Sequence, residues 1–331
     1  MKFLNIGLGS MGKRRLRNLH ALGHRDIVGF DPSEARRKEA EEKYQIKTTG
    51  HLTPELMDER EFFIISTPPD RHLEYLQLGV QHKKPTFVEA SVLSDGLSEV
   101  AMEAHKQKVI VAPSCTLRFH PLIKVIRELV KSGRYGAVCN FSYHMGQYLP
   151  DWHPWEHPRD FYVGQKKTSA GREMVPFEMT WLVDVVGIPR EVTGFHGGTH
   201  DMGVDIDDTY SVSMRLPGKA LGTLTVDVVS RFATRSLILN MERGQIRWNW
   251  EEKIVKLFDA NTKNWVHYFQ PEGQAAVGYN VNILEEMYVE ELGRFIHAAK
   301  GGAAFPNTLS DDIKVLSILE KSESTNRGAV I

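Results

Sequence analysis

The fold is decided by the first stretch of the chain, which reads KFLNI over residues 2–6 and GLGSMG over residues 7–12. The first part is a short apolar strand, and three glycines follow it at the spacing G-x-G-x-x-G. Between a strand and a helix this spacing predicts a phosphate-binding turn. Gly7 allows the tight turn, Gly9 lets backbone N–H groups approach a pyrophosphate, and Gly12 lets the helix pack close to the strand. We therefore expect a dinucleotide on Gly7, Leu8, Gly9, Ser10, Met11 and Gly12.

An acidic residue stands where this motif needs one. Asp31 ends the second predicted strand, residues 27–31, at the expected distance of about 20 residues. Its carboxylate would accept hydrogen bonds from ribose hydroxyls and repel a 2′-phosphate, which predicts NAD rather than NADP. Four arginines that lie close in sequence leave NADP open, or could equally be solvated helix charges: Arg14, Arg15, Arg36 and Arg37.

Composition narrows the function classes. The 331 residues are enough for two domains with full cores, and the formal net charge of −1 gives no basic field for nucleic acid or a membrane surface. No apolar run approaches the ~20 residues that span a bilayer. The first strand begins at residue 2, which leaves no room for a signal peptide. Cys115 and Cys139 form no spacing motif, so we expect a cytoplasmic protein.

Strands and helices alternate through the first third of the chain, which is typical of a doubly wound parallel sheet. In such a sheet ligands bind beyond the carboxyl ends of the strands. From residue 138 onward, eight predicted strands separated by turns indicate a large, mostly antiparallel sheet. The predicted fold is therefore α/β: a Rossmann domain over residues 1–120 and an α+β domain with an open-faced sheet over residues 121–331.

The motifs together resemble the Gfo/Idh/MocA oxidoreductases, a family that includes glucose-fructose oxidoreductase and inositol dehydrogenase. The resemblance covers nearly the whole chain and rests on the glycine loop, residues 66–72, Glu89, residues 118–121 and residues 205–209. It implies a nicotinamide-binding domain and an open sheet whose face holds the substrate or packs on another subunit. Besides the glycine loop and Asp31, it implies cofactor contacts at Ser66, Thr67, Pro68, His72, Glu89, Ala90 and Arg118.

The family's catalytic pattern is only partly present. Its usual Glu-Lys-Pro reads Glu89-Ala90-Ser91, so the lysine that normally assists proton transfer is absent. The family's aspartate and histidine, one helical turn apart, correspond to Glu178 and Trp181. Hydride transfer needs a group that moves the hydroxyl proton, and a histidine or a buried carboxylate would serve. The candidates are Glu178, His120, His153 and His157, with a structural role for Glu178 as the alternative.

A long aromatic and polar run, residues 147–162, suits recognition of a sugar ring or packing of a loop on a domain edge or subunit partner. It resembles a stretch in family members of surface-polysaccharide and nonulosonic-acid pathways. The predicted substrate-binding residues are Trp152, His153, Trp155, Arg159, Arg172 and Trp181. His153 and His157 have the spacing of metal ligands on a helix, but the prolines after each argue against a helix there. No metal is expected.

The sequence predicts one of two functions. The first is an NAD(P)-dependent oxidoreductase acting on a sugar, sugar nucleotide or related polyhydroxy compound. The second is a catalytically silent nucleotide- or sugar-binding regulator of the same fold, which the missing lysine at Ala90 motivates. Because large exposed apolar surfaces are rare on monomers, the open sheet predicts a homodimer or homotetramer.

Overall fold

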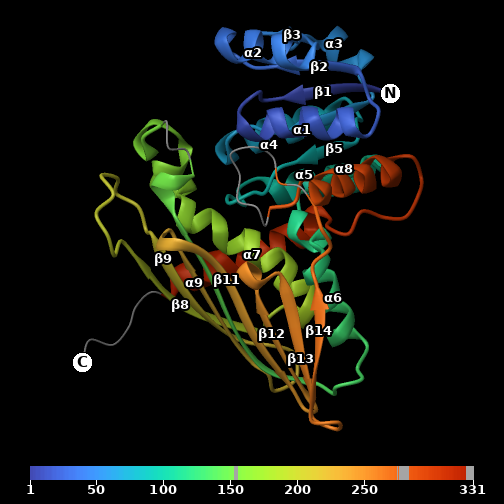
Figure 1. Cartoon of the computed structure of the whole chain (residues 1–331). Coiled ribbons are helices and arrows are strands. Elements are labelled where there is room, and N and C mark those ends of the chain that lie inside the picture. The colour runs from blue at the N-terminus through green and yellow to red at the C-terminus, as the bar shows by residue number, and fades with distance from the viewer. Residues whose placement is uncertain (153–155, 274, 276–282, 326–331) are drawn as a thin grey trace. The chain divides into compact units, whose positions relative to one another are not determined.

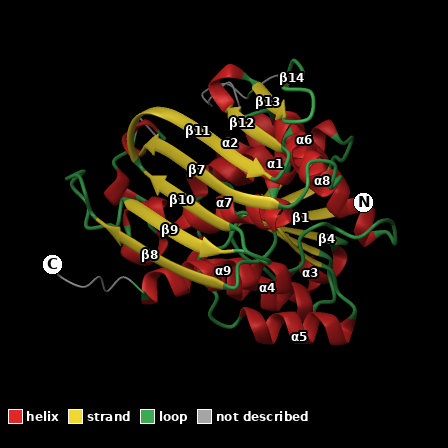
Figure 2. Cartoon of the chain, turned by 90° about the horizontal axis from the view of Figure 1, so that it is seen from below, coloured by secondary structure: helices red, strands yellow, loops and turns green. Residues whose placement is uncertain are grey.

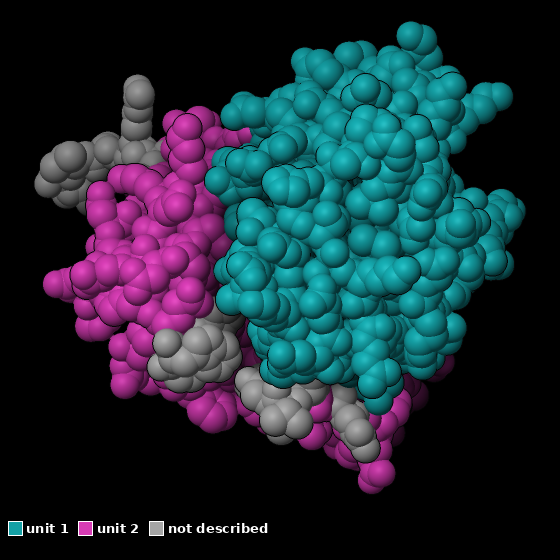
Figure 3. All heavy atoms as spheres, turned by 90° about the horizontal axis from the view of Figure 1, so that it is seen from above, with its two compact units in different colours: residues 1–116, 285–313 teal, residues 117–284, 314–331 magenta. Residues whose placement is uncertain are grey.

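The computed structural model describes residues 1–152, 156–273, 275 and 283–325. The chain divides into two compact units, which Figure 3 distinguishes by colour. Unit 1 comprises residues 1–116 and 285–313, and unit 2 comprises residues 117–284 and 314–331. Among the described residues, no helix combines the length and apolar character needed to cross a bilayer.

Unit 1 is built on a six-stranded parallel sheet with the order β3-β2-β1-β4-β5-β6, the strand order of a Rossmann fold. Its strands are β1 (Lys2–Ile6), β2 (Asp26–Phe30), β3 (Lys47–Thr49), β4 (Phe62–Ile65), β5 (Thr86–Val88) and β6 (Val111–Pro113). The central strands β1 and β4 are almost wholly buried, as continuous apolar strands between two helical layers should be. The predicted parallel sheet is confirmed.

Figure 1 shows the helices of unit 1, of which all but the last connect these strands. They are α1 (Ser10–Ala21), α2 (Glu34–Tyr44), α3 (Pro54–Glu59), α4 (His72–Gln81), α5 (Leu97–Gln107) and α8 (Glu285–Ala299). The last helix of the chain, α9 (Leu309–Ser324), begins in unit 1 and continues in unit 2.

Helix α8 lies in unit 1, whereas the predicted boundary assigned it to the second domain. The reason is its apolar and charged contacts with α1 and the sheet. The Phe295 ring packs against Phe62 and Phe87, and the guanidinium of Arg14 lies 4.2 Å from the ring centroid of Tyr288. Residues that follow the second sheet in sequence therefore complete the core of the first unit.

Unit 2 carries an eight-stranded sheet with the order β14-β13-β12-β11-β7-β10-β9-β8. Only the β7–β10 pair is parallel, so the predicted mostly antiparallel sheet is confirmed. The strands are β7 (Val138–Tyr148), β8 (Glu191–Gly197), β9 (Thr209–Arg215), β10 (Leu221–Asp227), β11 (Val229–Met241), β12 (Gly244–Asn249), β13 (Ile254–Asp259) and β14 (Asn264–Phe269).

One face of this sheet is packed and the other is bare. Along β7 the side chains of Phe141, Tyr143 and Met145 are buried, and these alternate residues share one face. Helix α7 (Ala170–Val186) covers that face, and α6 (Pro121–Lys131) precedes β7. In Figure 2 the strands of unit 2 lie in front of the helices, so the view is onto the uncovered face.

Candidate functional site

The three glycines of the loop after β1 have different surroundings. Gly7 has φ +94°, and a Cβ there would lie 2.5 Å from the carbonyl oxygen of Ser66. A Cβ at Gly12 would lie 2.0 Å from the carbonyl oxygen of Gly7, so a side chain at either position collides with backbone. A Cβ at Gly9 would meet no described atom within 4 Å. The open space in the loop is therefore at Gly9.

The first turn of α1 is suited to an anion. Gly9 is the N-cap residue and supplies no side-chain cap, and the first turn contains no acidic residue. The positive end of the helix and its backbone N–H groups thus face the open space at Gly9 without a competing carboxylate. These features fit the pyrophosphate of a dinucleotide.

Asp31 is fixed beside this loop. One carboxylate oxygen accepts a 2.9 Å hydrogen bond from the Leu8 N–H, and the other accepts one of 2.9 Å from the Ser33 N–H. Arg36 lies 3.8 Å from the carboxylate, and Arg37 donates to the carbonyl of Asp31 at 2.7 Å. The acidic residue is thus held at the end of β2, where the dinucleotide motif requires it.

Two further loops at the carboxyl ends of strands are joined by His72. Its Nε2 lies 3.0 Å from the carbonyl oxygen of Thr67, and its Nδ1 lies 3.2 Å from the hydroxyl of Ser91. Because a carbonyl only accepts, the proton of the neutral ring is on Nε2, and Nδ1 accepts from Ser91. Burial lowers the pKa of His72 to about 4, which keeps the ring neutral.

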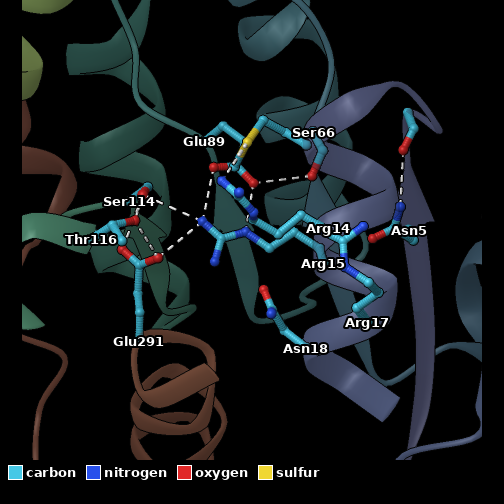
Figure 4. Close-up of polar contacts among 12 residues, drawn as sticks. Asn5, Arg14, Arg15, Arg17, Asn18, Ser66, Glu89, Ser114, Thr116 and Glu291 are labelled. Carbon is cyan, nitrogen blue, oxygen red and sulfur yellow. Dashed lines mark hydrogen bonds and ion pairs between the residues drawn. The ribbon is translucent and has the colours of Figure 1, made fainter. Parts of the chain in front are cut away.

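Arg15 on α1 forms the centre of a buried ion cluster, shown in Figure 4, that sequence reasoning missed. Its Nε donates to Glu89 at 2.6 Å, and its Nη2 donates to the other oxygen of Glu89 at 2.9 Å. The same Nη2 lies 2.9 Å from a carboxylate oxygen of Glu291 on α8. Ser66 adds a hydrogen bond to Glu89 at 3.2 Å. Three hydrogen bonds therefore hold the Glu89 side chain in place.

The arginines that left NADP open divide into two pairs. Arg14 and Arg15 are buried in ion pairs and are not solvated helix charges. Of the four arginines, only Arg36 and Arg37 contact Asp31, the residue that binds the ribose in this motif.

The remaining predicted cofactor contacts lie in both units. Pro68 is exposed after β4, and Ala90 is half-buried after β5, both in unit 1. Arg118 belongs to unit 2, where its Nε donates to the carbonyl of Thr180 on α7 at 2.9 Å.

Glu178 lies in the core of unit 2 with no exposed surface. One of its oxygens accepts hydrogen bonds from the Tyr143 hydroxyl at 2.7 Å and the Trp181 indole N–H at 2.9 Å. The other pairs with the guanidinium of Arg235, whose Nη2 lies at 2.8 Å and whose Nε donates at 2.9 Å. Four donors occupy this carboxylate. Such an arrangement favours the structural alternative for Glu178, and it buries Trp181 as well.

His120 is also part of the core of unit 2. It is the N-cap of α6, and its Nδ1 accepts a hydrogen bond from the Leu122 N–H at 3.3 Å. Its ring centroid lies 5.8 Å from that of Trp248. Burial, assisted by the charge of Arg235, lowers the pKa of His120 to about 3, so the ring is neutral.

The predicted substrate residues are distributed over unit 2. His153 and Trp155 lie outside the described residues. Trp152 packs against a small apolar cluster: Leu149, Val163, Ala170, Met202, Ile206 and Val228. The exposed Arg159 donates to His157, while Arg172 forms an ion pair of 2.6 Å with Glu323 on α9. The structure does not bring these side chains into one described site.

Two family models match the chain. Residues 1–114 match an oxidoreductase family with an NAD-binding Rossmann fold, and residues 123–247 match the GFO/IDH/MocA C-terminal domain. Together they cover well over half of the chain. It belongs to the Gfo/Idh/MocA family. The resemblance seen in the sequence is thereby confirmed, and the protein is an NAD-binding oxidoreductase.

Solved structures share the fold of this Gfo/Idh/MocA protein over 98% of its length. An Agrobacterium radiobacter oxidoreductase in complex with NAD+, L-tartaric acid and magnesium has a TM-score of 0.83 at 13% identity, with 96% of that chain covered. Levoglucosan dehydrogenase with NADH and levoglucosan has a TM-score of 0.82 at 14% identity and 97% coverage. UDP-N-acetylglucosamine 3-dehydrogenase from Acidithiobacillus ferrooxidans has a TM-score of 0.80 at 13% identity and 97% coverage. Comparison with curated proteins gave no match.

The residues that sequence reasoning missed carried one available signal. Glu291 lies on the same helical face as the apolar Met287, Tyr288 and Phe295, at separations of three or four residues. A carboxylate on an apolar face must find a buried partner. The pattern therefore predicts a buried ion pair, although it does not show that the partner is Arg15.

Proposed function

We propose that this Gfo/Idh/MocA protein is an NAD-dependent dehydrogenase that acts on a sugar, a sugar nucleotide or a related polyhydroxy compound. The observation that carries the cofactor assignment is the open first turn of α1 at Gly9, next to the fixed carboxylate of Asp31. The substrate class is supported by the ligands of the structural neighbours, which include levoglucosan and L-tartaric acid.

The cofactor would supply the hydride acceptor or donor, and the chain would supply orientation and proton transfer. The N–H groups at the start of α1 would bind the pyrophosphate, and Asp31 would accept from the ribose hydroxyls. Glu89 is ion-paired with Arg15 and is thus an oriented charge rather than a free base. His72 holds the loop that contains Thr67 against the loop that contains Ser91.

For proton transfer we propose His153. What supports this choice is that the other candidates are occupied: Glu178 by four donors, His120 as a helix cap and His157 by hydrogen bonds from Arg159. A His153→Asn variant should lose turnover while still binding NAD. The matched variants Glu178→Gln and His120→Asn should retain turnover, and loss of turnover only in Glu178→Gln would transfer the role to Glu178.

The decisive experiment follows NADH formation by fluorescence with purified protein and a panel of aldoses, polyols, UDP-sugars, polyhydroxy acids and nonulosonic acids. Steady conversion with NAD, weaker with NADP, is the expected result. If the protein acts in surface-polysaccharide or nonulosonic-acid metabolism, UDP-sugars or nonulosonic acids should give the fastest NADH formation in this panel. Tight NAD binding without turnover of any compound would favour the silent regulator instead, for which the replacement of the family lysine by Ala90 is the motivating observation.

We also propose that the bare face of the eight-stranded sheet packs on another subunit. Large apolar side chains lie exposed on its strands, among them Phe195 at 60%, Ile238 at 41% and Trp265 at 43% exposure. Light scattering should therefore give a dimer or tetramer, and Ile238→Glu should dissociate it. With two free cysteines, Cys115 and Cys139, a reducing cytoplasm is the location we propose.

A further inference from the structure

The ion cluster of unit 1 contains one guanidinium and two carboxylates. Arg15 and Glu291 have no exposed side-chain surface, and Glu89 is 12% exposed. When all three groups are ionised, the cluster carries one net negative charge inside the unit. Buried charge interacts strongly with its surroundings, because little water screens it.

The contacts of Glu291 are those of an ionised carboxylate. One oxygen accepts from the Cys115 N–H at 2.6 Å and from the Ser114 hydroxyl at 3.0 Å. The other accepts from the Thr116 hydroxyl at 2.8 Å and lies 2.9 Å from the guanidinium of Arg15. The pKa of Glu291 is raised, first by burial and also by the charge of Glu89, while Arg15, Thr116 and the Cys115 N–H act in the opposite direction.

The cluster lies at the end of the sheet where ligands bind in this fold. Glu89 directly follows β5, and Ser114 to Thr116 directly follow β6. Ser66, which directly follows β4, is bonded to Glu89. Figure 4 shows Glu89 and Glu291 converging on Arg15 from two sides. Three neighbouring strands of the parallel sheet thus end at one buried, negatively charged group.

A negative charge at this end distinguishes the two forms of the cofactor. The nicotinamide ring carries a positive charge when oxidised and is neutral when reduced. We propose that Glu291 is a specificity-determining residue, whose charge makes the site favour NAD+ over NADH. The proposal rests on the cofactor site proposed above, and it adds the redox form that the site prefers.

The test compares the affinities for NAD+ and NADH, measured separately by calorimetry at about pH 8.5, where the carboxylate form is favoured. In Glu291→Gln the ratio of the dissociation constants, NAD+ over NADH, should rise about tenfold. A tenfold change corresponds to about 1.4 kcal/mol between the binding free energies of the two forms. A residue that only holds Arg15 in place would alter both affinities equally.

The matched control is Thr116→Val, which removes one hydrogen bond to Glu291 and keeps the charge. Its ratio should equal that of the wild type. If circular dichroism shows that Glu291→Gln does not fold, Glu291→Met is the second neutral variant, in which Arg15 keeps its two hydrogen bonds to Glu89. An unchanged ratio in a folded neutral variant would overturn the proposed role of Glu291 and leave the proposed cofactor site in place. Wild-type protein that binds neither form would overturn the cofactor site as well.

Discussion

The Nδ1 atom of His72 and the hydroxyl of Ser91 are 3.2 Å apart, and this contact joins the loop after β4 to the loop after β5. The histidine ring is therefore hydrogen-bonded on both nitrogens, with Thr67 on the other side.

Replacing Ser91 by alanine should destabilise unit 1. The change leaves a buried ring nitrogen without its donor, which costs about 1–3 kcal/mol in the free energy of unfolding. Urea denaturation at neutral pH measures this loss. Ser98→Ala on the exposed side of α5 is the control, and it should stay within about 0.5 kcal/mol of the wild type. Equal stabilities of the two variants would contradict the role of the His72 contact.

Acid should destabilise both units through buried histidines. Their pKa values are about 4 for His72 in unit 1 and about 3 for His120 in unit 2, below the ordinary 6.5. As the pH falls below 6.5, the unfolded chain binds protons that the folded chain does not, so the free energy of unfolding falls. Each histidine contributes up to about 1.4 kcal/mol per pH unit until its folded pKa is reached.

Denaturation at several pH values between neutral and acidic checks this dependence. His120→Asn keeps a good N-cap and removes one titrating ring, so its stability should fall less steeply with acid. His267→Asn changes an exposed histidine and should leave the slope as it is. Parallel slopes for wild type and His120→Asn would show that His120 does not contribute.

Substitutions at two glycines of the loop should affect NAD binding and folding stability separately. Gly9 has φ −69° and open space around its Cβ position, so Gly9→Ala should fold normally. The added methyl occupies the space proposed for the pyrophosphate, and NAD affinity should fall at least about tenfold. Gly12→Ala places its methyl against the Gly7 carbonyl and should cost about 1–3 kcal/mol of stability. Calorimetry and urea denaturation measure the two effects, and a Gly9→Ala variant that binds NAD normally would contradict the assignment.

The Glu178–Arg235 pair should show strong coupling in a double-mutant cycle. Glu178→Leu removes the carboxylate that pairs with the buried guanidinium of Arg235, which costs about 3–5 kcal/mol. Adding Arg235→Met removes the buried positive charge as well, so the double variant should be more stable than Glu178→Leu. Additive losses in urea denaturation would mean that the pair contributes no coupling.

The local part of the site was predictable because its determinants are adjacent in sequence. The glycine spacing and Asp31 act within one strand–helix–strand unit, and the structure places them as the pattern indicates. Strand β3 and helix α3 were not predicted, because three and six residues are too few to show a period.

The long-range part could not be predicted from pattern. Arg172 was expected to bind substrate, but its partner Glu323 lies 151 residues away in sequence. The same holds for Ser114 and Glu291, which are 177 residues apart. A single sequence shows that a charge lies on a buried helical face, but only the folded chain shows which opposite charge meets it.

The assignment of α8 to unit 1 has a consequence for synthesis on the ribosome. Residues 1–116 leave the ribosome long before Glu285 and Glu291 are translated, so Arg14 and Arg15 at first lack these partners. The Rossmann unit thus receives α8, with its core residue Phe295, only after all of residues 117–284 have been made.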